Sequence, residues 1–503
     1  MDYYQNAKEA QKKLKTVSDS MCLAKWLQVS LHLPQGQTQS CYHPPTHQIP
    51  LDEIKNNPQA LHNTREKLKQ REMMLKGEKP KGCNYCWATE KEDNLSDRFY
   101  KSGEWWAVNE FDNVVDSGVG ESIAPTYVEV NFNQACNFKC IYCSPHLSTA
   151  WEKEIDEFGP INFKDGSMHN HIPSLRAANL MPLDVATAEN PYVDAFWKWW
   201  PELYKTVKVF RMTGGEPLMD KNTFKVLSYV DDHPNDELEL SITSNLCPPS
   251  QKLFDKFVTQ LKKIEEPRTW TDANDNIKTT PACKYFTLYV SVDSIGEQAE
   301  YIRDGLDFDI LQQNVEHILD NTHSTIISFI NTFNILTIPR LTEYLQMVLT
   351  LRKKYGMRIV DPIQSNNSSE LFDVATRQRI WFDTPFLQFP NWLSIQNLSR
   401  YPAYIEIMEQ ALEFMKQNKS DDNYYKTYTG FKDHEIVKLE RNITWAKSGT
   451  TQVSDEQFAH NQTKFYETTM QLDERRNLDF SKTFPELKDW WTDCTAQFES
   501  TDE

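Results

Sequence analysis

The sequence lacks any apolar run close to the roughly 18–20 residues that a membrane-spanning helix needs. Its first residues, MDYYQNAKEAQKKLK, lack the apolar stretch of a secretory signal peptide. Basic residues are fewer than acidic ones: the sequence has 54 Lys and Arg and 72 Asp and Glu, which gives a formal net charge of −18. Such a charge disfavours broad binding to nucleic acid, whose phosphates attract basic surfaces. We therefore expect a cytoplasmic protein without a membrane partner, and RNA is disfavoured as its substrate.

Cysteine, in contrast, is concentrated in two groups that hold seven of the ten cysteines. Because disulfides are rare in the cytosol, this grouping points to metal or redox chemistry. The central group is Cys136, Cys140 and Cys143, a C-x3-C-x2-C pattern directly after the strand-like run YVEVNF. Three thiolates on one loop can hold three corners of a four-iron cluster, which leaves the fourth iron open. A zinc site that adds His146 as a fourth ligand is the alternative.

From about residue 125 the sequence alternates between strand-like and helical patterns. The strand-like runs are 127–132, 207–213, 238–244, 285–293, 325–335 and 358–363, with helical patterns at 221–231, 251–264, 309–320 and 341–355. This alternation predicts parallel β/α units, and six units make an open, partial barrel. Residues 1–110 predict two helices, near 7–29 and 58–77, and residues 365–503 read as mainly helical. The chemistry of such a fold lies at the carboxyl ends of its strands.

Small and polar residues follow several of these predicted strands. In MTGGEPLM the two glycines let the backbone approach a ligand closely, although a simple strand-to-helix turn would also explain them. Glycine is scarce, with 15 residues in 503, so an adjacent pair beside a carboxylate is informative. The candidate binding residues at the strand ends are Gly214, Gly215, Glu216, Pro217, Ser244, Asn245, Ser291 and Asp293, and Arg303 follows in EYIRDGLDFD. Arg303 alone also fits a surface helix.

Residues 125–340 resemble radical S-adenosylmethionine enzymes in the order of their motifs. These motifs are the cysteine loop, with Tyr142 before its last cysteine, then GGEP, SITSN, VSVDS and Arg303. The resemblance implies that the open iron is chelated by S-adenosylmethionine, whose reductive cleavage yields a 5′-deoxyadenosyl radical that abstracts hydrogen from the substrate. It implies that Tyr142 lies near the adenine and that the residues from Gly214 to Arg303 named above position the cofactor. It also implies an electron donor such as flavodoxin or ferredoxin. An insertion of about 50 residues with FWKWWPELY (196–204) departs from the pattern.

The N-terminal group, Cys22, Cys41, Cys83 and Cys86, supplies four thiolates, enough to ligate a [4Fe–4S] cluster or a structural zinc fully. The segment between Cys22 and Cys41 predicts a hairpin that turns at Pro-Gln-Gly. It resembles the start of SPASM and twitch auxiliary-cluster domains, which implies a second [4Fe–4S] cluster. Those domains follow the radical core, whereas this one precedes it. Zinc or free thiols remain alternatives, and Cys247, Cys283 and Cys494 are expected to be buried small hydrophobes.

We therefore expect an α/β protein with a twitch-like auxiliary domain at 1–115, a partial (β/α)6 radical core at 120–363 and a helical extension at 364–503. The expected function is radical S-adenosylmethionine chemistry, with peptide or protein modification favoured because auxiliary-cluster relatives often act on such substrates. Radical chemistry on a small molecule or sugar is the first alternative. A non-catalytic zinc-binding interaction protein is the second. The sequence names no residue that exchanges the substrate hydrogen.

Overall fold

The computed structural model describes residues 3–92, 94–185, 189–272, 275–355, 378–387, 389–420 and 429–500. Two compact units make up the chain: residues 1–134, 178–242 and 269–284 form the first, and residues 135–177, 243–268 and 285–503 form the second. The units interleave along the sequence, so the three-domain division at 115, 120 and 364 stays a prediction. Within the described ranges, no helix has both the length and the apolar character needed to cross a membrane.

The first unit is built on parallel strands that pair side by side, in the order β1, β4, β8 and β9. Two short strands, β2 and β3, extend the β1 side in antiparallel pairings. The strands are β1 (Gln28–His32), β2 (Gln37–Gln39), β3 (His47–Gln48), β4 (Tyr127–Asn131), β8 (Val209–Thr213) and β9 (Asn235–Ser244), whose last two residues pass into the second unit. The predicted hairpin is confirmed, and Gly36 in its turn has a φ of +66°.

Side chains alternate between the two faces of these strands. One face carries apolar residues such as Val130, Phe210 and Met212, all fully buried. Helix α11 (Pro191–Leu203) packs there, with the Trp200 ring 4.8 Å from that of Phe210. The opposite face is polar, which is unusual because strands of parallel sheets are mostly apolar on both faces.

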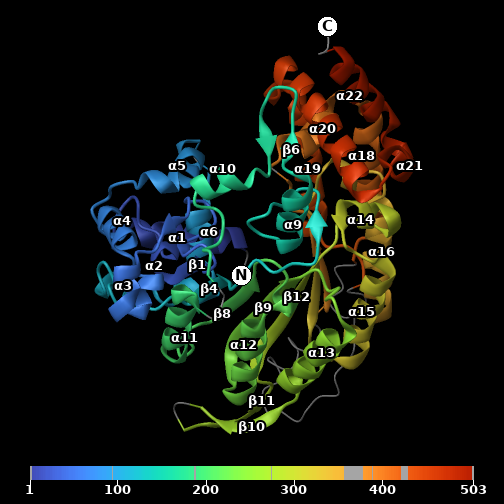
Figure 1. The fold of residues 1–503 in the computed structure, drawn as a ribbon. Coiled ribbons are helices and arrows are strands. Elements are labelled where there is room, and N and C mark those ends of the chain that lie inside the picture. Colours follow the sequence, from blue (N-terminus) through green and yellow to red (C-terminus); the bar gives the residue numbers. More distant parts are fainter. Residues whose placement is uncertain are drawn as a thin grey trace. The chain divides into compact units, whose positions relative to one another are not determined.

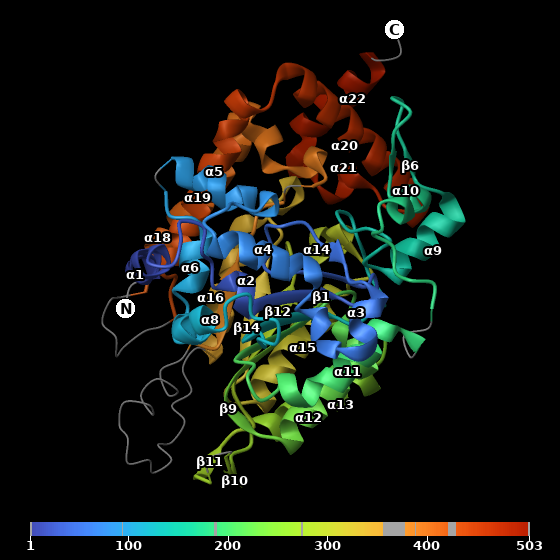
Figure 2. The same cartoon turned by 90° about the vertical axis from the view of Figure 1, so that its left-hand side faces the viewer.

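The other helices of the first unit gather around these strands and are drawn in blue and green in Figures 1 and 2. They are α1 (Tyr3–Lys15), α2 (Ala24–Leu27), α3 (Leu51–Asn56), α4 (Arg65–Leu75), α5 (Asn84–Lys91), α6 (Asp97–Ser102), α7 (Trp105–Val108), α8 (Phe111–Asp116) and α12 (Lys221–Asp232). A two-stranded ribbon, β10 (Arg268–Thr271) with β11 (Ile277–Thr280), follows later in the chain.

In the second unit the strands β12, β14 and β15 pair in parallel, in that order. They are β12 (Cys283–Ser291), which begins in the first unit, β14 (Ile326–Ile330) and β15 (Ile380–Asp383). Four helices with buried apolar residues accompany these strands. Helix α13 (Gln251–Glu265) precedes β12, helices α14 (Gly296–Ile302) and α15 (Phe308–Asn321) lie between β12 and β14 in the chain, and α16 (Leu341–Tyr355) lies between β14 and β15. The bounds of α13, α15 and α16 lie within a few residues of the predicted patterns, so the predicted strand–helix alternation is confirmed in this part of the chain, whereas α14 was not predicted.

The C-terminal part of the second unit is mainly helical, as predicted, and is drawn in orange and red in Figure 1. Its helices are α18 (Pro402–Gln417), α19 (Asp433–Gln452), α20 (Asp455–Arg476), α21 (Phe480–Thr483) and α22 (Lys488–Ser500). A buried ion pair between Arg352 of α16 and Glu435 of α19 joins these helices to the strand–helix part, with Arg352 Nη2 2.5 Å from Glu435 Oε1.

One sequence prediction of secondary structure is wrong. The single helix expected near 7–29 is instead α1 and α2 followed by strand β1, because Gln28–His32 pairs with β4 and this pairing overrides the local helical pattern. The strand β15, at the start of the aromatic run 380–393, was not predicted, although the region from 365 onward is mainly helical as expected. The strand predicted at 358–363 lies outside the described residues.

Candidate functional site

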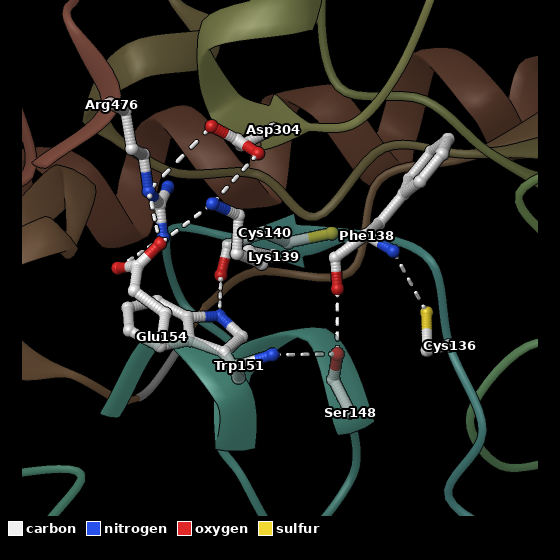
Figure 3. Close-up of polar contacts among 9 residues, drawn as sticks. All are labelled: Cys136, Phe138, Lys139, Cys140, Ser148, Trp151, Glu154, Asp304 and Arg476. Carbon is white, nitrogen blue, oxygen red and sulfur yellow. Dashed lines mark hydrogen bonds and ion pairs between the residues drawn. The ribbon is translucent and has the colours of Figure 1, made fainter. Parts of the chain in front are cut away.

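The central cysteine loop begins just after β4 and is held in place by its own backbone and by helix α9 (Thr149–Phe158). The short strand β5 (Lys139–Cys140) pairs with β13 (Arg303–Asp304), which places Arg303 opposite Cys140. Ser148, the N-cap of α9, donates its hydroxyl to the carbonyl of Phe138 at 2.6 Å. Trp151 of α9 donates its indole N–H to the carbonyl of Cys140 at 2.8 Å, as Figure 3 shows.

An ion network that includes Lys139 of this loop also involves helix α9 (Figure 3). Glu154 of α9 accepts from Lys139 at 2.8 Å and from Arg476 of α20 at 3.1 Å. Asp304 lies 3.3 Å from Lys139 Nζ and 3.7 Å from Arg476 Nε. The side chains of Glu154 and Arg476 are 3% and 1% exposed, so their charges depend on each other. The network fixes the loop that carries Cys140 between α9, β13 and α20.

Three of the predicted cofactor residues form a connected set, of which Arg303 contacts Cys140. Arg303 Nη1 donates to Cys140 Sγ at 3.5 Å, and its Nε lies 2.7 Å from Asp293 Oδ2. Tyr142 donates its hydroxyl to the same carboxylate at 2.6 Å. Asp293 is 0% exposed, so its charge is balanced by Arg303 in a dry environment. In this arrangement Asp293 and Arg303 position the cysteine loop.

The turn after β9 is tied to the cysteine loop by an asparagine that the sequence reasoning missed. Asn137 donates to the carbonyl of Cys247 at 2.8 Å and accepts from Asn245 at 3.0 Å. Ser244 accepts from the backbone N–H of Leu246, whose φ is +55°. Ser291 is the last residue of β12, beside Ile330 of β14. The polar residue Asn137 lies within the cysteine motif, which is the signal that could have identified it.

The GGEP segment belongs to the first unit and lies against the residues that end β4. Gly214 has a φ of +121°, and a Cβ on it would lie 2.2 Å from Asn131 Oδ1. Only glycine fits such a position. Glu216, 1% exposed, accepts from the backbone N–H of Leu218 and so caps the short 3-10 turn that Pro217 begins.

The four N-terminal cysteines line one cavity in the first unit. Cys22, Cys41, Cys83 and Cys86 share it with three cations, Lys25, Arg98 and Lys101, and with the carboxylate of Asp97. Burial, together with the neighbouring cysteines, raises the pKa of the Cys22 thiol to about 12. Ser40 also lines the cavity, and its buried hydroxyl has no hydrogen-bond partner among the described residues. These residues fit a metal group bound by four thiolates, such as a [4Fe–4S] cluster. The bound group would be anionic, which suits the neighbouring cations, and its sulfides could accept a hydrogen bond from the Ser40 hydroxyl.

The pKa values of the thiols show whether the central loop also fits an iron–sulfur cluster. Burial and the proximity of Cys140 and Cys136 raise the pKa of the Cys143 thiol to about 12. Metal ligands must be thiolates, so three of them together require a strongly positive partner. An iron–sulfur core supplies that charge, and Arg303 adds to it. Within the described ranges, no three His, Cys, Asp or Glu side chains converge closely enough for a single metal ion. A four-iron cluster would take one thiolate at each iron.

The remaining three cysteines are buried, as predicted. Cys247 is 7%, Cys283 4% and Cys494 0% exposed.

Comparison with known proteins supports the radical S-adenosylmethionine superfamily through one partial match. GTP 3',8-cyclase of Campylobacter lari, a radical S-adenosylmethionine enzyme, is 24% identical to this chain over 146 residues. The match covers 27% of this chain and 33% of that protein, so the chain spans about a third of the relative's length. No family model matches the chain. The likeness supports the superfamily only.

Proposed function

We propose that the protein cleaves S-adenosylmethionine reductively at a [4Fe–4S] cluster held by Cys136, Cys140 and Cys143. The observation that carries this proposal is the cysteine loop itself, which has three thiols beside the buried Arg303–Asp293 pair. When bound, the cluster and cofactor supply a 5′-deoxyadenosyl radical. We further propose that the strands from β4 to β15 form the partial barrel predicted from the sequence.

The protein's own residues then orient the cofactor and keep the loop rigid. We assign the methionyl group to Gly214, Gly215, Glu216 and Pro217, the ribose or carboxylate to Ser244, Asn245 and Ser291, and the adenine to the neighbourhood of Tyr142. Asp293 and Arg303 act mainly through Cys140 and Tyr142, since the carboxylate is already occupied by those partners. The ion network around Glu154 and Arg476 holds the loop from behind.

We propose a second [4Fe–4S] cluster at Cys22, Cys41, Cys83 and Cys86, in a twitch-like domain placed before the core. Support comes from the shared cavity with Lys25 and Arg98 and from the unpartnered Ser40 hydroxyl. Four protein ligands leave no iron open, so this cluster fits electron transfer better than substrate coordination. An external electron donor such as flavodoxin or ferredoxin would reduce the protein.

The substrate that we propose is a peptide or protein. The ground for this choice is the resemblance to auxiliary-cluster enzymes, which often act on such substrates. Radical chemistry on a small molecule or sugar is the second candidate, and it is favoured by the relative named GTP 3',8-cyclase.

Anaerobic reconstitution tests the proposal. We expect about eight irons and eight sulfides per chain, four of each for every cluster, and 5′-deoxyadenosine when dithionite and S-adenosylmethionine are added. Replacing Cys83 and Cys86 with Ala should remove about four irons. The matched control, Cys283→Ala with Cys494→Ala, should remove none. Tightly bound zinc without cofactor cleavage would establish the non-catalytic alternative.

A further inference from the structure

Helices α2 and α4 of the first unit bury three cations near the N-terminal cysteines. Lys25 lies on α2, while Lys67 and Arg71 lie one turn apart on α4. Arg71 Nε donates to the backbone carbonyl of Lys25 at 3.1 Å, which joins the two helices. The exposed fractions of Lys25, Lys67 and Arg71 are 3%, 1% and 0%. Lysine and arginine are almost never buried so fully unless an anion faces them, because a protein interior stabilises their charge far less than water does.

The hydrogen bonds of these three side chains satisfy their donors without balancing their charge. Lys25 Nζ donates to the side-chain amide of Gln70 at 2.7 Å, and Lys67 Nζ donates to the hydroxyl of Thr38 at 2.8 Å. Arg71 donates from Nε and Nη1 to carbonyl oxygens at 2.9 to 3.2 Å. Across the part of the chain that the structure describes, none of the three forms an ion pair with a carboxylate. The protein itself therefore leaves this positive charge uncompensated.

The four-cysteine site is where an anion would face these cations. Lys25 lines the cavity that the four cysteines share. Lys67 Nζ lies 3.3 Å from the carbonyl oxygen of Gln39, two residues before Cys41. Burial lowers the pKa of Lys67 well below its ordinary value, and Arg71 and Lys25 lower it further, whereas Cys41 acts in the opposite direction. A negatively charged group on the cysteines would thus compensate all three cations.

The other charged side chains that line this cavity mostly have partners of their own. Arg98 Nε lies 2.7 Å from Glu90 Oε1. Asp97 Oδ2 lies 2.7 Å from His43 Nε2. Lys101 also lines the cavity, but it is half-exposed, so water screens its charge. The uncompensated charge of this region therefore resides mainly on the buried cations of α2 and α4.

The central cysteine loop differs in its charge balance. There Arg303 Nε lies 2.7 Å from Asp293 Oδ2, and Arg476 Nε lies 3.1 Å from Glu154 Oε2. These buried cations are neutralised by carboxylates of the protein, whereas those beside the N-terminal cysteines are not. The difference in charge gives the N-terminal site a property that the central loop lacks.

We infer that Lys25, Lys67 and Arg71 stabilise the reduced state of the N-terminal cluster and so make this cluster an acceptor of single electrons. The inference rests on the proposed second cluster. Four thiolates on an oxidised [4Fe–4S] core carry a net charge of about −2, and one added electron makes it about −3, so buried cations favour the reduced state. In this step one electron passes from the external donor, a reduced flavin or iron–sulfur protein, to the oxidised core. No bond forms or breaks, and no proton moves.

The test is a potentiometric titration of the reconstituted full-length protein, followed by electron paramagnetic resonance. The signal of the N-terminal cluster is identified as the one that is lost in Cys83→Ala with Cys86→Ala. Lys67→Met removes one buried charge, so the equilibrium constant for one-electron reduction should fall about tenfold or more, which makes the midpoint potential more negative by about 59 mV or more. The matched control is Lys69→Met, the same substitution at an exposed position of α4, which should leave the midpoint unchanged.

A second variant keeps all three cations and decides the question if Lys67→Met does not fold. Gln70→Glu retains an acceptor for Lys25 Nζ but supplies a carboxylate, so the same equilibrium constant should fall about threefold or more. A midpoint equal to that of Lys69→Met in the folded variants, or a more positive one, would overturn the inference.

Iron analysis of the same preparations separates this inference from the proposed function. About four irons in the parent protein instead of about eight would overturn the second cluster and this inference with it. About eight irons with an unmoved midpoint would overturn this inference alone. Formation of 5′-deoxyadenosine is scored separately, because it tests the central cluster.

Discussion

Substitution of Glu154 tests most directly whether the ion network holds the cysteine loop in place. It accepts from Lys139 and Arg476, and its side chain is 3% exposed. Removing one partner of a buried ion pair costs about 3–5 kcal/mol. Glu154→Gln keeps the volume and some hydrogen bonding, and Asp304 still lies 3.3 Å from Lys139 Nζ. We therefore expect a loss of about 2 kcal/mol in the free energy of unfolding at pH 7.

The effect of Glu154→Gln depends on pH, with a sign that follows from the same contacts. Burial raises the pKa of Glu154, but Arg476 and Lys139 outweigh it, so the pKa lies below its ordinary value of 4.5 in the folded protein. The carboxylate therefore contributes its stability above pH 4.5 and loses it as the pH falls through the lowered pKa. The gap between the parent protein and the variant should close in acid.

Urea unfolding of the iron-free protein at pH 7 and at about pH 3.5 measures both quantities. The matched control is Glu157→Gln, the same substitution at an exposed position of α9, which should change the unfolding free energy by less than about 0.5 kcal/mol. Equal losses in the two variants would refute the claim that the network holds the loop, and so would a gap that widens in acid.

Three further predictions concern the site. Gly214→Ala places a methyl group against Asn131 and strains the backbone. The dissociation constant for S-adenosylmethionine, measured by equilibrium dialysis, should therefore rise more than tenfold while the iron content stays unchanged. Tight binding by this variant would contradict the assignment. Tyr142→Phe removes the hydroxyl that donates to Asp293, so urea unfolding should show a loss of about 1 kcal/mol, and an unchanged midpoint would argue against this contact. Asn137→Ala should lower the iron content of the central cluster, because the turn at Cys247 loses its tie to the loop; iron analysis equal to the parent's would show that the tie is dispensable.

The sequence predicted the elements whose signals are local. The strands that end at Asn131, Thr213, Ser244 and Ser291 combine alternating apolar residues with a distinct polar or glycine-rich ending, and they lie where expected. The hairpin before Cys41 was likewise predictable, because Gly36 marks its turn. Such signals need no knowledge of the rest of the chain.

Contacts between distant parts of the sequence were not predictable from one sequence. Glu154 and Arg476 are 322 residues apart, and neither belongs to a motif. The parallel pairing of β1 with β4 was missed because a helix and a hairpin were the simplest local interpretations of residues 7–41. The short strand β15 was missed because its four residues lie within an aromatic run that also fits a helix. In each case tertiary packing decides between local alternatives.

Electron paramagnetic resonance of the reduced, reconstituted protein tests the central claim most directly. If Cys136, Cys140 and Cys143 leave one iron open, S-adenosylmethionine should bind that iron and change the g values of the cluster signal. The same addition should change nothing in Cys140→Ala, which lacks a ligand to the central cluster. A reduced cluster in the parent protein whose spectrum is identical with and without S-adenosylmethionine would contradict the account.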